Sequence, residues 1–530
     1  MTKSSRNTRL LTLLLAAVLG ITSLALPTGA SAASKWNVYK EAQRLAAKGS
    51  YSAAIAKYQS ILPEFVRGKE YGNAGQIHRR IGDAYVKLGK YDEAVENWDQ
   101  EAYYYDKAGQ TLSSYAVKVK ANALRSSAQI FYESKVVPAP KRKLSVLEPV
   151  NGAYIGAYAE RDPIAHRPFY TEGFPKLTGK KHAGYLAYMT YGTPLSSLRT
   201  YIQRAKESGT ALEIGLQPND INSVKDDAYL QQLAKDAGAA EIPIFLRFAN
   251  EMNGKWVPWY TTPEQFIQKF RIVANAFHKY APDNVAMVWA PGSEPENTIQ
   301  SYYPGDAYVD WVGVSLYSIF TPTGDPLQQN QDRSSHIGKL DNIYKWYADR
   351  KPIMITEGGV SYMYPEKMQD KTDWAVYRTR ELYASLPLIY PQVKAVFWFD
   401  SNSAKTERVK YYQLSANEKL LKAYKQGVAS GYYLSNISDS SKVSYRNVAA
   451  TAVPAENVSL TSYVKSWSPT LSKVTYEIGG KIVGTASQAP WKADINFAPY
   501  HGKTLTVTLR AYGPDGKLVL TRKLPARVSN

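Results

Sequence analysis

The sequence predicts three folded parts in one chain: α-helical repeats, a (β/α)8 TIM barrel and a small all-β sandwich. The prediction depends on two changes in hydrophobic periodicity, because helices, buried strands and half-buried strands each space their apolar residues differently. Residues 35–135 follow a helical spacing, residues 149–427 alternate short apolar runs with amphipathic stretches, and residues 428–530 alternate apolar and polar positions. Residues 136–148, a basic segment interrupted by prolines, form the predicted linker between the first two parts.

Residues 1–33 have the pattern of a secretory signal peptide. Three basic residues precede an apolar run, and the small residues of "ASAAS" supply a cleavage site. The apolar run is shorter than the roughly 20 residues that a spanning helix needs, and an uncleaved N-terminal anchor is the alternative. We therefore expect a protein that is secreted or associated with the cell wall.

The composition narrows the possible chemistry and the partners. The 530 residues include no cysteine, which excludes disulfides, thiolate metal sites and a cysteine nucleophile, and which in an exported protein is typical of a Gram-positive bacterium. The formal net charge is +19, and such a charge attracts anionic surfaces such as cell-wall polymers. The basic residues are scattered among acidic ones rather than gathered in a block, so we expect no nucleic-acid partner.

The helical part contains an internal repeat. The stretch around Gly49, which continues to Ala54, recurs 40 residues later around Gly89 and continues to Ala94. The small alanines allow two helices to approach closely, and a third, degenerate helical unit is expected at residues 111–134. The pattern resembles the tetratricopeptide repeat, which implies a protein partner. A helical spacer or a cap on the next part is the alternative.

Eight near-continuously apolar runs mark the strands of the second part, as expected for strands that are buried on both faces. The runs are residues 153–159, 184–190, 211–217, 242–249, 285–291, 310–317, 352–359 and 394–400. Amphipathic stretches such as residues 262–280 separate them, so eight strand–helix units predict a (β/α)8 barrel. A doubly wound open sheet is the alternative, but no G-x-G-x-x-G follows the first run.

The third part carries the signals of antiparallel hairpins. Its apolar and polar residues alternate, and "GG" and "PDG" mark tight turns between the runs. This pattern resembles the immunoglobulin-like modules that are appended to secreted bacterial enzymes.

Two glutamates lie where the barrel places active sites. Glu251 follows the fourth apolar run and Glu357 ends the seventh, and catalytic residues of this fold lie at the carboxyl ends of the strands. A retaining glycosidase needs such a pair, about 5 Å apart, in which one carboxylate attacks the sugar and the other acts as acid and base. Neither a histidine pair nor a carboxylate cluster has the spacing of metal ligands, so we expect no metal and no cofactor.

The neighbours of the two glutamates suit carbohydrate binding. Asn250 can hydrogen-bond a sugar hydroxyl, and Tyr317 can hydrogen-bond Glu357 and hold it ionised. Arg247 faces either the barrel interior or the helices, and a charge near Glu357 would lower the pKa of that carboxyl group. Four tryptophans near strand ends offer faces that can stack on sugar rings: Trp256, Trp259, Trp289 and Trp398.

The barrel resembles glycoside hydrolase family 26, whose best-known members are endo-β-1,4-mannanases. Four blocks carry the resemblance and occur in the order of the family: "RFANEMNGKWVPW", "VAMVWAPG", "YYPGDAYVDWVGVSLY" and "KPIMITEGG". The resemblance implies that Glu251 is the acid/base and Glu357 the nucleophile. It also implies that Tyr317, Trp256 and Trp398 line the site.

Two positions depart from the pattern of the mannanases in this family. Asn250 stands where they usually carry histidine, and Gly292 stands where the family often has asparagine. The sugar is therefore left open between β-1,4-mannan, a related hemicellulose and an exopolysaccharide. Two other classes of function also remain: a non-catalytic polysaccharide-binding protein, and a cell-wall scaffold that acts through its helical repeats.

Overall fold

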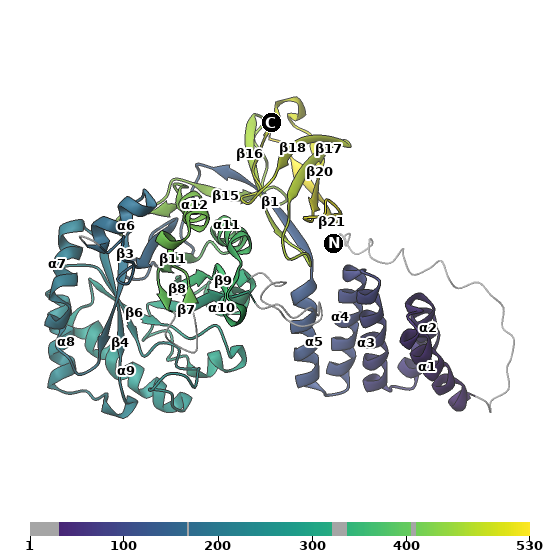
Figure 1. Cartoon of the computed structure of the whole chain (residues 1–530), viewed down its shortest axis with the longest axis horizontal. Helices are drawn as coiled ribbons and strands as arrows, with labels where there is room; N and C mark the ends of the chain where they lie inside the picture. The colour runs from purple at the N-terminus through teal and green to yellow at the C-terminus, as the bar shows by residue number, and fades with distance from the viewer. Residues whose placement is uncertain (1–30, 167–168, 321–335, 404–409, 530) are drawn as a thin grey trace, which may run out of the picture. The chain divides into compact units, whose positions relative to one another are not determined.

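The computed structural model describes residues 31–529 except for three internal segments (Figure 1). These segments are residues 167–168, 321–335 and 404–409. Most of the predicted signal peptide, residues 1–30, lies outside the described residues. The chain divides into two compact units, Met1–Lys118 and Val119–Asn530. None of the described helices is both long and apolar enough to cross a membrane.

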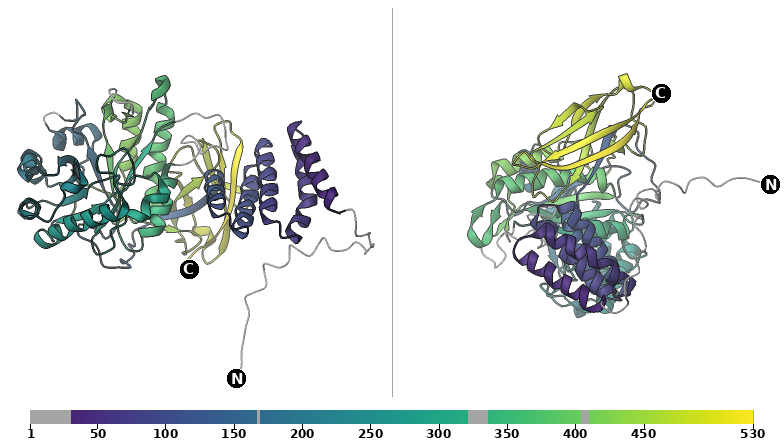
Figure 2. Two further views of the ribbon diagram at one scale, coloured as in Figure 1. Left: turned by 90° about the horizontal axis from the view of Figure 1, so that it is seen from below. Right: turned by 90° about the vertical axis from the view of Figure 1, so that its right-hand side faces the viewer.

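The first unit is built from helices of nearly equal length. They are α1 (Ser31–Ala47), α2 (Tyr51–Arg67), α3 (Tyr71–Lys87), α4 (Tyr91–Lys107) and the beginning of α5 (Thr111–Leu124). Ala54 and Ala94 are fully buried, as the repeat predicts. A Cβ at Gly82 would lie 2.6 Å from Nε1 of Trp98, so the packing of α3 against α4 that Figure 2 shows requires glycine there.

The second unit contains a closed barrel of eight parallel strands, which confirms the predicted (β/α)8 fold. The strands are β2 (Ala153–Tyr158), β3 (Gly184–Thr190), β4 (Ala211–Gln217), β5 (Ile244–Phe248), β6 (Val285–Trp289), β7 (Trp311–Ser318), β8 (Ile353–Val360) and β11 (Val393–Phe399). They pair in chain order, and β11 pairs with β2 to close the barrel. The short strand β14 (Tyr433–Leu434) pairs with β2 outside the ring.

Helices cover the outside of the barrel between successive strands (Figure 1). They are α6 (Tyr170–Thr178), α7 (Arg199–Ser208), α8 (Ala228–Gly238), α9 (Pro263–Tyr280), α10 (Asp341–Tyr347), α11 (Thr372–Ile389) and α12 (Glu418–Val428), with a 3-10 helix (Glu296–Tyr302) between β6 and β7. Along β5, Leu246 and Phe248 pack in the layer between strands and helices, whereas Phe245 joins the cluster inside the barrel. Arg247 has the same parity as Phe245 and therefore also faces the interior.

Two four-stranded antiparallel sheets enclose a separate apolar core in the second unit. One sheet contains β15 (Ser444–Asn447), β1 (Ser127–Ser134), β16 (Asn457–Lys465) and β19 (Ala493–Asn496); the other contains β18 (Lys481–Ala486), β17 (Lys473–Ile478), β20 (Thr504–Tyr512) and β21 (Leu518–Arg527). The predicted all-β part is therefore a sandwich of two sheets.

The prediction assigns the residues of strand β1 to the helical part, whereas they belong to the sandwich. Residues 111–134 were expected to be a helical unit, but the helix ends at Leu124 and the following residues pair with β15 and β16. Ala128, Ile130 and Tyr132 alternate along β1 and enter the sandwich core. This alternating stretch of residues is too short to stand out in the sequence directly after an alanine-rich helix.

Candidate active site

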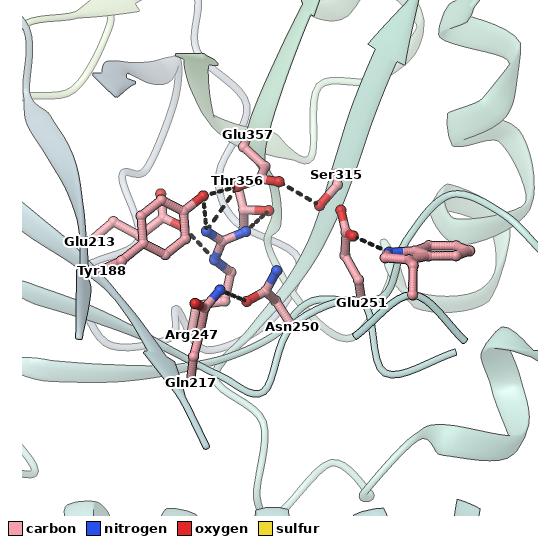
Figure 3. A network of polar contacts seen from close by, with 10 residues as sticks. Tyr188, Glu213, Gln217, Arg247, Asn250, Glu251, Ser315, Thr356 and Glu357 are labelled. Atoms are coloured by element: carbon pink, nitrogen blue, oxygen red, sulfur yellow. Dashed lines mark hydrogen bonds and ion pairs between the residues drawn. The ribbon is translucent and has the colours of Figure 1, made fainter. Parts of the chain in front are cut away.

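Polar side chains gather inside the barrel near the carboxyl ends of its strands, where active sites of this fold lie. Tyr188 comes from β3 and Arg247 from β5. Ser315 comes from β7, Glu357 from β8, and Glu251 from the loop after β5 (Figure 3). Residues that are far apart in the sequence therefore meet at one mouth of the barrel.

Glu251 lies in a tight loop just beyond β5. Ala249 has a φ of 46° and Glu251 a φ of 56°, both in the left-handed region that residues with a side chain rarely adopt. The Glu251 amide donates to the carbonyl oxygen of Ala290 at 2.8 Å, which ties the loop to the end of β6. The Trp256 indole N–H donates to Oε2 of Glu251 at 2.6 Å. These contacts fix the carboxyl group at the mouth of the barrel.

The surroundings of Glu251 favour its protonated form. Burial raises the pKa of this half-buried carboxyl group, and the negative charge of Glu357 raises it further. Hydrogen bonds with Trp256 and Ser315 and the charge of Arg247 oppose the rise but do not reverse it. A carboxyl group with a raised pKa keeps its proton at a higher pH than an ordinary glutamate, which is what a general acid requires.

A β-bulge in β8 turns Glu357 toward the barrel interior. Val314 of β7 pairs with Ile355, but the next residue of β7, Ser315, pairs with Glu357, so β8 contains one extra residue. The pairing of β8 with β11 shifts in the same region. In a regular strand, Thr356 and Glu357 would point to opposite faces, whereas a bulge re-aims a side chain. Here Arg247 contacts both residues inside the barrel.

Three donors surround the Glu357 carboxylate. The Tyr188 hydroxyl donates to Oε2 at 2.5 Å, and Nη2 of Arg247 donates to the same oxygen at 3.1 Å. The Ser315 hydroxyl donates to Oε1 at 3.5 Å. Glu357 is 6% exposed, and hydrogen bonds from cationic and neutral donors stabilise a buried carboxylate in its ionised form. These donors favour the ionised form that the sequence predicts for Glu357.

Arg247 joins two buried carboxyl groups. Its Nε lies 3.0 Å from Oε1 of Glu213, a residue of β4, while its Nη2 contacts Glu357. Arg247 and Glu213 are both 0% exposed. Burial alone would lower the pKa of the Arg247 guanidinium, but the charges of Glu357 and Glu213 raise it well above its ordinary value. The guanidinium therefore remains a permanent positive charge inside the barrel.

Ser315 lies between the two predicted catalytic glutamates, as Figure 3 shows. Its hydroxyl contacts Oε1 of Glu357 at 3.5 Å, and its proximity lowers the pKa of Glu251. One buried hydroxyl therefore links an acid that favours its proton to a carboxylate that favours its charge. The predicted separation of about 5 Å between the carboxyl groups stays a prediction of the retaining mechanism.

The predicted residues on either side of Glu251 have different environments. Asn250 is 5% exposed, and its Oδ1 accepts a hydrogen bond from Gln217 at 3.2 Å. Trp256 is 44% exposed and lies beside Glu251. Trp259 is instead buried, and its indole N–H donates to the Asn250 carbonyl oxygen at 2.8 Å. Trp259 therefore braces the loop, and its predicted role in sugar stacking is wrong.

Two other predicted stacking residues, Trp289 and Trp398, point away from the mouth. Trp289 is fully buried against Tyr303 and Tyr347 in the layer between strands and helices. Trp398 packs edge-on against Tyr424 of α12, and its indole N–H donates to a backbone carbonyl. Neither ring offers a face to a ligand at the mouth, because both side chains point outward from their strands, toward the helices.

Tyr317 lies inside the barrel near Glu357, where its ring stacks on Tyr412 with centroids 5.2 Å apart. Burial raises the pKa of its hydroxyl well above the ordinary value, and the charge of Glu357 raises it further. Tyr188 donates a hydrogen bond to Glu357 at 2.5 Å, and the hydrogen bond from Tyr317 to Glu357 stays a prediction. Phe399 packs edge-on against Tyr317 and completes an aromatic wall beside the carboxylate.

Sequence reasoning missed Tyr188 and Glu213, which lie within strands rather than at their ends. A usable signal was present for Glu213 in "ALEIGLQ", because a charged side chain in a strand buried on both faces needs a partner. Among the side chains that the structure describes, histidine, aspartate and glutamate nowhere form a group of three that could hold a metal ion.

A barrel with two carboxyl groups at its mouth is an arrangement that glycoside hydrolases use. Residues 211–380 match the model of glycosyl hydrolase family 26. The barrel is therefore of the family 26 type, as the four sequence blocks predict.

Similar proteins include several carbohydrate-active enzymes. Endoglucanase H of Acetivibrio thermocellus is 27% identical over 300 residues, which cover 53% of this chain and 30% of the relative. A β-1,3-xylanase of Alcaligenes sp. is 29% identical over 157 residues, which cover 28% of this chain and 30% of the relative. The chain thus spans less than a third of the length of these relatives. A solved family 26 β-mannanase from Bacteroides ovatus is 16% identical over 55% of this chain and 91% of that chain, with a TM-score of 0.39, a likeness too distant to add to the argument.

Proposed function

We propose that the protein is a retaining endo-glycosidase that hydrolyses a β-linked polysaccharide by double displacement. The observation that carries the proposal is the position of Ser315 between two carboxyl groups in unlike environments (Figure 3). The raised pKa of Glu251 suits a general acid, and the donors around Glu357 suit an ionised nucleophile. A pair of carboxyl groups with these opposite tendencies is the arrangement that retaining glycosidases use.

The two glutamates would act in two steps. In the first, the Glu357 carboxylate attacks the anomeric carbon, the glycosidic C–O bond breaks, and Glu251 gives its proton to the departing oxygen. In the second, Glu251 takes a proton from water, the water oxygen attacks the anomeric carbon, and the bond to Glu357 breaks. Both carboxyl groups then return to their starting states. Arg247 and Tyr188 stabilise the carboxylate that is released in the second step.

The exposed surface of Trp256 beside the acid supports binding of a sugar chain, because aromatic faces pack on the apolar faces of pyranose rings. We propose β-1,4-mannan or a related hemicellulose or exopolysaccharide as the substrate, with Asn250 positioned to contact a sugar hydroxyl. The names of the two relatives add β-glucan and β-1,3-xylan to the candidates.

A polysaccharide panel tests both the substrate and the class of function. Wild-type protein is incubated with mannan, glucomannan, xylans, mixed-linkage glucan and exopolysaccharide, and reducing ends and binding are measured. We expect the wild type to cut one polymer internally. The variant Glu251→Gln should no longer cut this polymer but should still bind it. Binding of a polymer without release of reducing ends by the wild type would instead identify a polysaccharide-binding protein.

Azide separates the roles of the two glutamates. In Glu251→Ala, azide needs no base and attacks the glycosyl-enzyme, so the product is a glycosyl azide with the β configuration of the substrate. In Glu357→Ala, azide replaces the missing nucleophile and gives the α configuration. The exposed Glu264, at the start of α9, supplies the control Glu264→Ala, which should hydrolyse like the wild type. The same anomer from both variants, or no azide product, would contradict the assignment.

We also propose that the chain is exported and associates with an anionic cell wall, on the basis of residues 1–33 and the net charge of +19. The helical repeats would then bind a protein partner. N-terminal sequencing of protein from the culture medium should find a chain that begins near Ala33. Retention of the intact N-terminus in the cell would contradict export.

A further inference from the structure

Glu213 has an unusual place for a charged residue. It lies in the middle of β4, is 0% exposed, and points into the barrel behind the residues at its mouth. Arg247 from β5 lies 3.0 Å from its Oε1. Glu357 from β8 is the other charged group whose field it feels. A carboxyl group buried at this depth needs a partner or a proton.

Two carboxyl groups share one guanidinium in this interior. If both were ionised, the buried trio would hold a net negative charge, which burial disfavours. Glu357 receives hydrogen bonds from the Tyr188 hydroxyl and from Nη2 of Arg247. Glu213 lies close to Nε of Arg247, but within the described residues neither of its oxygens accepts a hydrogen bond of good geometry. Glu213 is therefore the weaker competitor for the negative charge.

We propose that Glu213 is a positioning residue that holds Arg247 against the nucleophile Glu357, and that its carboxyl group is protonated while the enzyme works. The proposal rests on the proposed function, because that function assigns the nucleophile. A neutral Glu213 can accept a hydrogen bond from Nε of Arg247 and orient the guanidinium, yet leaves its positive charge to Glu357. The planar guanidinium makes this possible, since Nε and Nη2 contact different partners at the same time.

Ionisation of Glu213 would disturb the nucleophile. Burial raises the pKa of the Glu213 carboxyl group to about 8; the charge of Arg247 opposes this rise and that of Glu357 adds to it. Above that pH, Glu213 competes with Glu357 for the guanidinium and adds a second negative charge beside it. The Tyr188 and Tyr317 hydroxyls also belong to this cluster, and burial holds the pKa of both well above the ordinary value. Activity should therefore fall on the alkaline side as Glu213 loses its proton.

The variant Glu213→Gln tests the proposal in the full chain, because glutamine has the shape of the protonated acid and cannot ionise. We compare kcat/KM of variant and wild type on the polysaccharide that the wild type cuts fastest. Loss of activity through one ionisation is about tenfold per pH unit, so the ratio of variant to wild type should rise about tenfold from about pH 7 to about pH 9. The ionisation of Glu251 affects both proteins and cancels in the ratio.

A second measurement needs no substrate. In the wild type, the native state keeps a proton on Glu213 that the unfolded chain has already lost, so the stability falls as the pH rises from about 4.5 to about 8. Glu213→Gln lacks this loss, and the difference in Tm between variant and wild type should grow over that range. The buried pair Arg378–Glu381 supplies the control Glu381→Gln, whose differences from the wild type should not change in this way.

The possible results separate the parts of the argument. A rising Tm difference together with a flat activity ratio would overturn positioning, and flat curves in both measurements would overturn protonation. Failure of the azide experiment with Glu357→Ala would instead refute the assignment of the nucleophile. Glu213→Leu adds a check on positioning, since a missing partner for Arg247 should lower kcat on the order of 10- to 100-fold with little change in KM. A lower Tm with an unchanged kcat would show a purely structural role.

Discussion

Replacement of Arg247 by methionine should destabilise the barrel strongly. The variant leaves Glu213 and Glu357 without the cation that lies 3.0 and 3.1 Å away, and these carboxyl groups are 0% and 6% exposed. Removal of one partner of a buried ion pair typically costs about 3–5 kcal/mol. For a domain of this size, 1 kcal/mol shifts Tm by roughly 2 °C, so the barrel transition should fall by roughly 6–10 °C.

The loss should also depend on pH. Without Arg247, the buried carboxyl groups keep their protons in the folded state while the unfolded chain loses them, so the deficit should be larger at about pH 8 than at about pH 5. Scanning calorimetry of the full chain at both pH values measures it. The exposed pair Arg204–Glu207, at 2.8 Å, supplies the control Arg204→Met, which should cost less than about 1 kcal/mol. A similar, pH-independent shift in both variants would refute the argument.

Two further substitutions test the immediate surroundings of the catalytic pair. Tyr188→Phe removes a 2.5 Å hydrogen bond to the Glu357 carboxylate, worth about 1.5–3 kcal/mol, so kcat/KM should fall roughly 10- to 100-fold without loss of folding by circular dichroism. Trp256→Phe removes a donor that lowers the pKa of Glu251, so this pKa should rise further and the alkaline limb of kcat/KM should move to higher pH. An unchanged kcat/KM in the first variant, or an alkaline limb that moves down in the second, would contradict these assignments.

The barrel and the location of Glu251 and Glu357 at its mouth could be predicted because burial leaves a direct trace in the sequence. Strands buried on both faces appear as apolar runs, and a glutamate at the end of such a run lies at the mouth of the barrel. The direction of a side chain inside a run follows from counting positions, which shows that Trp398 points outward because Ala395 and Phe397 point inward. The sequence alone does not reveal which residue begins the count. Trp289 was misplaced for the same reason.

Interactions across the barrel could not be predicted from spacing. Tyr188 and Glu213 lie on β3 and β4, and their partners Glu357 and Arg247 are separated from them by 169 and 34 positions along the sequence. Pairing of β4 with β5 brings Glu213 and Arg247 together, closure of the barrel brings Tyr188 to Glu357, and strand-to-strand register determines which side chains face each other. A charged residue inside an apolar run signals that a partner exists, but it does not identify that partner.

Both glutamates reach the site through local departures from regular strand structure. Glu251 and Ala249 take left-handed backbone angles, which cost roughly 1–2 kcal/mol per residue with a side chain. Glu357 faces inward only because Thr356 is an extra residue in β8. Such irregularities persist only where the surrounding structure holds them, and here the Ala290 carbonyl and the Arg247 guanidinium do so. In both segments the departure from regular structure brings a glutamate to the mouth of the barrel, which is a reason to assign function to them rather than to other buried acids such as Asp400.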